Sequence, residues 1–169
     1  MVKARFQRRQ VIAALTAFAA APHMAWAEAY IDLDWSDLLP EGEVVIPRAI
    51  LSLIEEDHID LSSQQPPSTG VRTDWNGQIV RLPGFIVPID ISGDGVRAFI
   101  LVPYVGACVH VPPPPANQLV FVTTEKPYES TGLYEAVNVT GMFGASATVT
   151  QLAQIGYALS ADHIEPFQY

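Results

Sequence analysis

The sequence predicts a mainly β protein: a small OB-like barrel of five to six strands with an extended N-terminal arm. Three observations support this prediction. From residue 77 onward, short runs rich in Ile, Val, Leu and Phe alternate with Gly- and Pro-containing turns. The 14 prolines in 169 residues disfavour long helices. Apolar residues make up 49% of the chain and charged residues 16%, which excludes a disordered chain and provides for a core.

The strands are expected in five apolar runs, at 78–91, 96–104, 119–124, 135–143 and 156–164. Pro83 and Gly84 interrupt the first run, as a bulge or a barrel bend requires. Residues 92–95 form a turn that joins the first two strands. Residues 98–102 are apolar on both faces, which is typical of a central strand. A helical turn is expected at 146–155.

The first 27 residues have the pattern of a cleaved export signal. They carry four basic side chains and no acidic one, followed by an apolar run of eleven at 11–21. This run is too short to span a bilayer, and Ala25-Trp26-Ala27 matches a signal-peptidase site. We therefore expect a periplasmic protein. Arg8-Arg9 resembles the twin-arginine signal, so the Sec and twin-arginine routes both remain open.

After signal cleavage, residues 28–70 form an acidic arm and linker and residues 71–169 form the β-barrel domain. Trp35 with Leu38 and Leu39 is expected to dock the arm, and residues 47–57 could form a short helix. Nine basic residues less the four of the signal leave five against 18 acidic ones, a net charge of −13. This charge excludes nucleic acid as a partner, and the mature chain contains no apolar run that could span a membrane.

A metal site is predicted at Cys108 and His110. On an extended chain the two side chains point to the same side, about 7 Å apart at Cα, so both can reach one zinc ion. They supply half of a tetrahedral shell. His163 is the first further candidate because it follows the apolar positions of the last strand. The other candidates are His58, Asp162 and Glu165.

Cys108 also allows two other interpretations. It is the only cysteine, so no intrachain disulfide can form, and a free cysteine is often simply buried. A histidine beside a thiol can instead create a nucleophile, with Asn117 or Gln118 as the orienting group. Whether the protein is an enzyme stays open at this point.

The four prolines at 112–115 provide a second candidate site. Such a tract forms a stiff polyproline rod, which either binds a partner or serves as a wall that supports the Cys-x-His segment. We favour the wall, because the tract directly adjoins Cys108 and His110. Pro112, Pro113, Asn117 and Gln118 are the candidate binding residues. The alternative to a metal-binding accessory protein is therefore a non-metal OB-like module that docks on an envelope or ABC-transporter partner.

Three segments resemble a known family. They are Trp-Ser-Asp-Leu-Leu-Pro at 35–40, Leu-Pro-Gly-Phe-Ile-Val-Pro-Ile at 82–89, and the stretch 99–118 with Gly-Ala-Cys-Val-His-Val-Pro-Pro-Pro-Pro-Ala-Asn-Gln. Together they resemble DUF3299, a bacterial family of exported proteins of unknown function. The resemblance implies an export signal and a small β-rich domain. It also implies, by the genes near its members, a role in zinc or other metal handling at the envelope, near ABC transporters.

Overall fold

The computed structural model describes residues 29–42, 65–93, 95–109 and 111–167. The proposed export signal, the proposed helix at 47–57, and His58 and His110 lie outside these residues.

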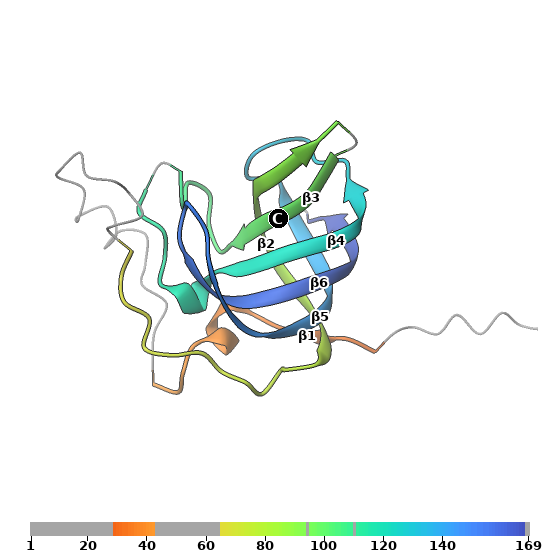
Figure 1. The fold of residues 1–169 in the computed structure, drawn as a ribbon. Coiled ribbons are helices and arrows are strands. Elements are labelled where there is room, and N and C mark those ends of the chain that lie inside the picture. The colour runs from red at the N-terminus through yellow and green to blue at the C-terminus, as the bar shows by residue number, and fades with distance from the viewer. Residues whose placement is uncertain (1–28, 43–64, 94, 110, 168–169) are drawn as a thin grey trace, which may run out of the picture.

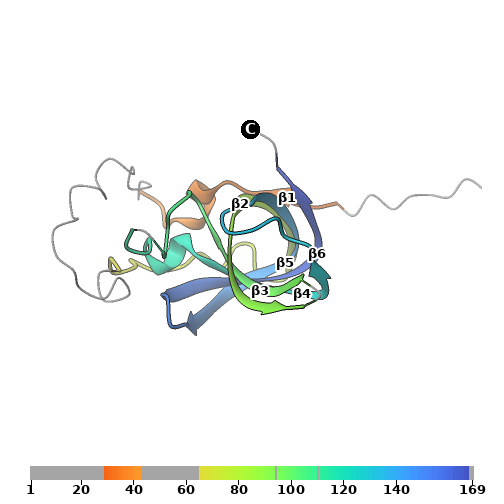
Figure 2. The ribbon, with the colours of Figure 1, turned by 90° about the horizontal axis from the view of Figure 1, so that it is seen from above.

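Five strands form a ring of hydrogen-bonded neighbours (Figures 1 and 2). They are β2 (Gln78–Ser92), β3 (Gly95–Val102), β4 (Val120–Tyr128), β5 (Ala136–Val149) and β6 (Gln154–Pro166). The strand order is β2-β3-β4-β6-β5, and β5 pairs with β2 to close the ring. Only the β4–β6 pair is parallel within it. The predicted mainly β, OB-like fold of five to six strands is confirmed.

Strand β2 bends so that it pairs with two other strands of the ring. Its first half pairs with β5 and its second half with β3, and Phe85 pairs with both strands. Gly84 lies at the bend, where an added Cβ would come within 2.8 Å of Leu101 Cγ. The absence of a side chain therefore allows the sheet to fold back on itself, as the Pro83-Gly84 pair predicts.

The arm packs on the ring of strands, and its Leu33 and Leu38 join the buried cluster inside the ring. It contributes β1 (Ile31–Asp32), which pairs in parallel with β2, and the 3-10 helix η1 (Trp35–Leu38). Leu33, Leu38 and Leu39 are buried against the barrel, so the arm docks through the apolar pair that the sequence singles out. Neither η1 nor the second 3-10 helix, η3 (Ala116–Gln118), is long enough to cross a membrane, and the described ranges contain no helix that is.

The buried side chains form two clusters, one on each face of the sheet. Inside the ring, a cross-strand row of Ile86, Leu101, Val120 and Tyr157 is fully buried. On the outer face, Val87, Ile100, Val102 and Leu119 form a second cluster beneath the loop at 103–119. This loop explains why strand β3 is apolar on both faces.

The helical turn expected at 146–155 is wrong. Strand β5 continues to Val149 and β6 begins at Gln154, and these two residues pair across a tight hairpin. Thr150 closes the hairpin, because its backbone and its hydroxyl both donate to the carbonyl of Ala153. The consecutive β-branched residues Thr148, Val149 and Thr150 favour this extension of the ladder over an isolated helical turn.

Candidate functional site

The loop at 103–119 folds back over the outer face of the barrel. Its residues Ala107, Cys108 and Leu119 belong to the outer apolar cluster, together with Ala153 and Ile155 from the start of β6. The loop therefore covers part of the outer face formed by β3 and β4, which are the second and third strands of the ring. In OB-like barrels this is the face that binds oligonucleotides or oligosaccharides.

The proline tract of this loop is a buried wall. Pro112, Pro113 and Pro114 are buried, and the peptide bonds of the tract are trans. The Gln65 amide donates to the carbonyls of Pro114 and Gln154 at 2.8 Å each, which fastens the tract to β6. The geometry thus favours the wall over an exposed rod.

Cys108 lies in an apolar environment. Its thiol is buried, and burial raises its pKa to about 12, so the neutral thiol is the stable form. Its φ is +67°, so this part of the loop turns and is not the extended segment on which the Cys-x-His geometry was predicted. Gly106 accepts backbone hydrogen bonds from Val109 and Val111 around this turn.

The structure does not bring His163 near Cys108. His163 is on β6, eight positions beyond Ile155 of the Cys108 cluster, which corresponds to about 26 Å of strand. Its side chain is 66% exposed and lies 3.5 Å from Glu165. A register shift in the β5–β6 ladder between Ala161 and His163 changes the alternation of β6, so Ile164, and not His163, packs against the inner cluster. Within the described ranges, no group of three His, Cys, Asp or Glu residues could hold a metal ion.

Asn117 and Gln118 are both buried but differ in their contacts. The Gln118 amide nitrogen donates to the Trp35 carbonyl at 2.9 Å, which ties η3 to the arm. Asn117 is 1% exposed, and neither its Nδ2 nor its Oδ1 has a hydrogen-bond partner. These contacts place the Gln118 amide nitrogen against the arm.

An apolar rim, which the sequence did not single out, lies where two loops meet. We define the apolar rim as Tyr104, Val105, Val109, Leu133 and Tyr134. The Tyr134 hydroxyl donates to the Ala107 carbonyl at 2.8 Å and its amide donates to Ile86 O, which joins the loop at 129–135 to the loop at 103–119. Val105 and Leu133 are 41% and 47% exposed.

The rim loop at 129–135 is held by one carboxylate. Glu135 accepts hydrogen bonds from Tyr128 Oη, Ser130 Oγ and the amide of Thr131 at 2.7–2.8 Å. Burial alone would raise the pKa of Glu135, but these hydrogen bonds outweigh it and the pKa is lowered. The sequence contains one signal for the apolar rim, because the apolar residues Leu133 and Tyr134 lie between two predicted strands. No sequence pattern links these two residues to Val105.

Comparison with known proteins agrees with this fold. The sequence matches the family described as "Protein of unknown function (DUF3299)" over residues 35–166. A crystal structure of a DUF3299 family protein from Pseudomonas aeruginosa PAO1 is similar with a TM-score of 0.71 and 36% sequence identity. The similarity covers 83% of this chain and 98% of that chain. No curated protein matches the sequence.

Proposed function

The chain belongs to the DUF3299 family of proteins of unknown function, and we propose that it is an exported periplasmic binding module that docks on an envelope protein through its apolar rim. The observation that carries this proposal is the pair of exposed apolar side chains, Val105 and Leu133, on two loops that are fastened to each other. Exposed apolar side chains grouped on one rim are typical of interaction sites.

The rim is ordered before any partner arrives. Tyr134 fastens one loop to the other, Gln65 fastens the proline tract, and Glu135 closes the 129–135 loop. A preordered surface loses less conformational entropy on association, which favours binding. The proline wall therefore supports the rim and is not itself the contact.

The charge of the mature chain indicates the kind of partner. A net charge of −13 repels acidic surfaces and accelerates association with a basic one. We therefore propose an envelope protein with an apolar contact surrounded by basic residues. The family resemblance makes an ABC-transporter component the first partner to test. The periplasmic location rests on the pattern of residues 1–27.

Of the two functions that the sequence leaves open, the geometry favours this module over a zinc carrier. The apolar cluster around Cys108 favours a neutral thiol, whereas a zinc ligand is a thiolate. The zinc proposal has its own test: the metal content of the natively purified protein, compared with that of Cys108→Ser. A zinc content that falls by one equivalent in Cys108→Ser would favour the zinc carrier.

Site-specific photo-crosslinking in cells tests the docking proposal. A photoreactive residue at Val105 or Leu133 should capture one defined envelope protein, and the same residue at Val149, which is 80% exposed on the β5–β6 hairpin, should not. Leu133→Asp should then abolish capture from position 105, whereas Val149→Asp should leave it unchanged. Equal capture from all three positions, or capture that survives Leu133→Asp, would refute the rim as the docking site.

A further inference from the structure

Strand β6 continues past the point where its neighbour β4 leaves it. The parallel β4–β6 ladder ends with the pair Thr124 and Ala161, whereas the antiparallel β5–β6 ladder continues to Pro166. Figure 2 shows this end of β6 extending beyond β4 toward the C-terminus. Among the described residues, 162–166 of β6 therefore have a ladder partner on one side only. We call the unpaired side of residues 162–166 the open edge.

The alternation of the β5–β6 ladder shows which backbone groups point to the open edge. The Phe167 amide donates to Ala136 O at 2.9 Å, in the register that pairs β6 with β5 from residue 163 to residue 166. In an antiparallel ladder, successive residues turn their N–H and C=O groups to opposite sides. Residues 163 and 165 therefore face β5 as Phe167 does, while the N–H and C=O of Ile164 point to the open edge.

The side chains of the open edge are complementary to a second copy of the same edge. His163 and Glu165 are exposed on the outer face, with Nε2 and Oε2 3.5 Å apart, and Ile164 between them packs on the inner cluster. If two such edges run antiparallel about a two-fold axis at Ile164, His163 of each copy lies opposite Glu165 of the other. An axis at His163 or at Glu165 would instead place like side chains opposite each other, which is unfavourable. The side-chain order thus selects one register.

We propose that the open edge is the interface of a homodimer, in which β6 pairs antiparallel with β6 of a second copy. The Ile164 amide of each copy donates to the Ile164 carbonyl of the other, and two His163–Glu165 pairs lie on either side of the axis. Because the same edge is used by both copies, the assembly closes at two. Pro166 has no N–H to donate, which keeps the paired segment short. The apolar rim consists of other residues, so this proposal and the docking proposal can fail separately.

Sedimentation and amide hydrogen exchange of the purified mature chain, residues 28–169, test this proposal together. Sedimentation equilibrium over a concentration series should show a reversible monomer–dimer equilibrium. In the same series the Ile164 amide should exchange more slowly as the dimer forms, because it becomes hydrogen-bonded only there. The Glu165 amide faces β5 and should be protected at every concentration. This difference between neighbouring amides distinguishes pairing at the open edge from a dimer formed through another surface.

Charge substitutions on the exposed face test the register. His163→Glu should weaken dimerisation about tenfold, because it places two carboxylates opposite each other in both cross-strand pairs. Adding Glu165→Lys to His163→Glu should restore the dimer, since each pair then joins opposite charges again. Adding Asp90→Lys to His163→Glu changes the net charge by the same amount and should not restore it.

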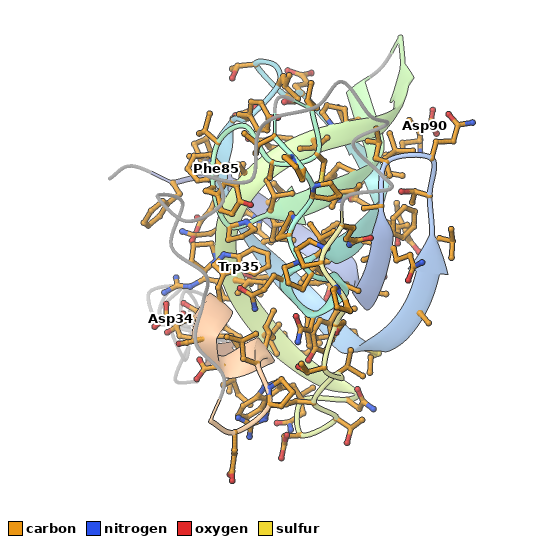
Figure 3. All side chains as sticks on the ribbon, turned by 90° about the vertical axis from the view of Figure 1, so that its left-hand side faces the viewer. Asp34, Trp35, Phe85 and Asp90 are labelled. Carbon is orange, nitrogen blue, oxygen red and sulfur yellow. The ribbon has the colours of Figure 1, made fainter. Side chains whose placement is uncertain are left out.

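Asp90 is a suitable control because it is exposed and distant from the open edge. Phe85 pairs with Ala136, which accepts the Phe167 amide, so Phe85 marks the end of β6. Figure 3 shows Asp90 on the opposite side of the molecule from Phe85. A monomer throughout the concentration series, exchange of the Ile164 amide that does not change with concentration, or equal rescue by Asp90→Lys and Glu165→Lys would overturn the proposal.

Discussion

The hydroxyl of Tyr157 connects strand β6 to Leu38 in the arm and to Arg72 in the segment before β2. A substitution that removes this hydroxyl alone therefore tests how the arm is held. The side chain is fully buried at the start of β6, and its ring stacks on Phe143 with centroids 5.1 Å apart. Its hydroxyl donates to Leu38 O in the arm and accepts from the amide of Arg72, both at 2.7 Å. Tyr157→Phe keeps the ring and its stacking and removes only these two hydrogen bonds.

We expect Tyr157→Phe to lower the free energy of unfolding by about 2–4 kcal/mol. The two lost hydrogen bonds together contribute about 1–3 kcal/mol net, and the unpaired carbonyl at buried Leu38 adds about 1 kcal/mol of unmet desolvation. For a chain of 169 residues the melting temperature should fall by roughly 4–16 °C. The loss should be concentrated in the arm, because one of the two lost hydrogen bonds holds Leu38 O of the arm.

Urea denaturation and amide hydrogen exchange measure this effect. The amide of Leu33, which donates to Arg81 O, should lose protection before the amides of β3 and β4 do. Tyr128→Phe is the matched control, because it removes a half-buried hydroxyl whose acceptor, Glu135, keeps its other donors. A loss below about 0.5 kcal/mol for Tyr157→Phe, or a loss equal to that of the control, would refute the assigned role.

Three further outcomes are expected. Asn117→Leu should raise the free energy of unfolding by about 1–3 kcal/mol in thermal denaturation, because it removes a buried amide without partners, and a decrease would mean that a bound molecule satisfies that amide. Native Cys108 should react with a thiol reagent at pH 8 at least about a hundredfold more slowly than in urea, since burial raises its pKa to about 12, and equal rates would contradict its burial. The hydrogen bonds that lower the pKa of Glu135 stabilise the fold above the unfolded pKa of about 4.3 and lose this effect as the pH falls through the folded pKa. Urea denaturation between pH 7 and pH 3 should therefore show a steeper acid loss in the wild type than in Glu135→Gln.

Much of the β architecture was predictable because strand patterns are local. The run at 78–91 matches β2 to within one residue at its C-terminal end, and the glycine at its centre marks the bend. The β5–β6 hairpin was mispredicted because its turn at Thr150 is stabilised by cross-strand pairing, which a short window does not contain. His163 follows the inner positions of β6 in sequence, yet it is exposed because a register shift after Ala161 changes the alternation of the strand.

The candidate site was harder to predict because its parts come from distant segments. The Gly-Ala-Cys-Val-His-Val-Pro stretch at 106–112 was identified as unusual, but the chemistry of its thiol depends on which side chains cover it. The cover is an apolar cluster drawn from β2, β3, β4 and β6, and it makes Cys108 a buried thiol. The apolar rim joins residues 105 and 133, which no spacing rule connects.

The sequence by itself determined the class of fold, the apolar arm anchors and the family, because periodicity, turn residues and a rare motif are properties of neighbours along the chain. The wall interpretation of the proline tract also came from the sequence. Only the tertiary structure decided that Asn117 lacks partners and that Gln118 and Tyr157 bind the arm. Burial and hydrogen-bond partners depend on segments more than 80 residues apart, and these meet only when the ring of strands closes.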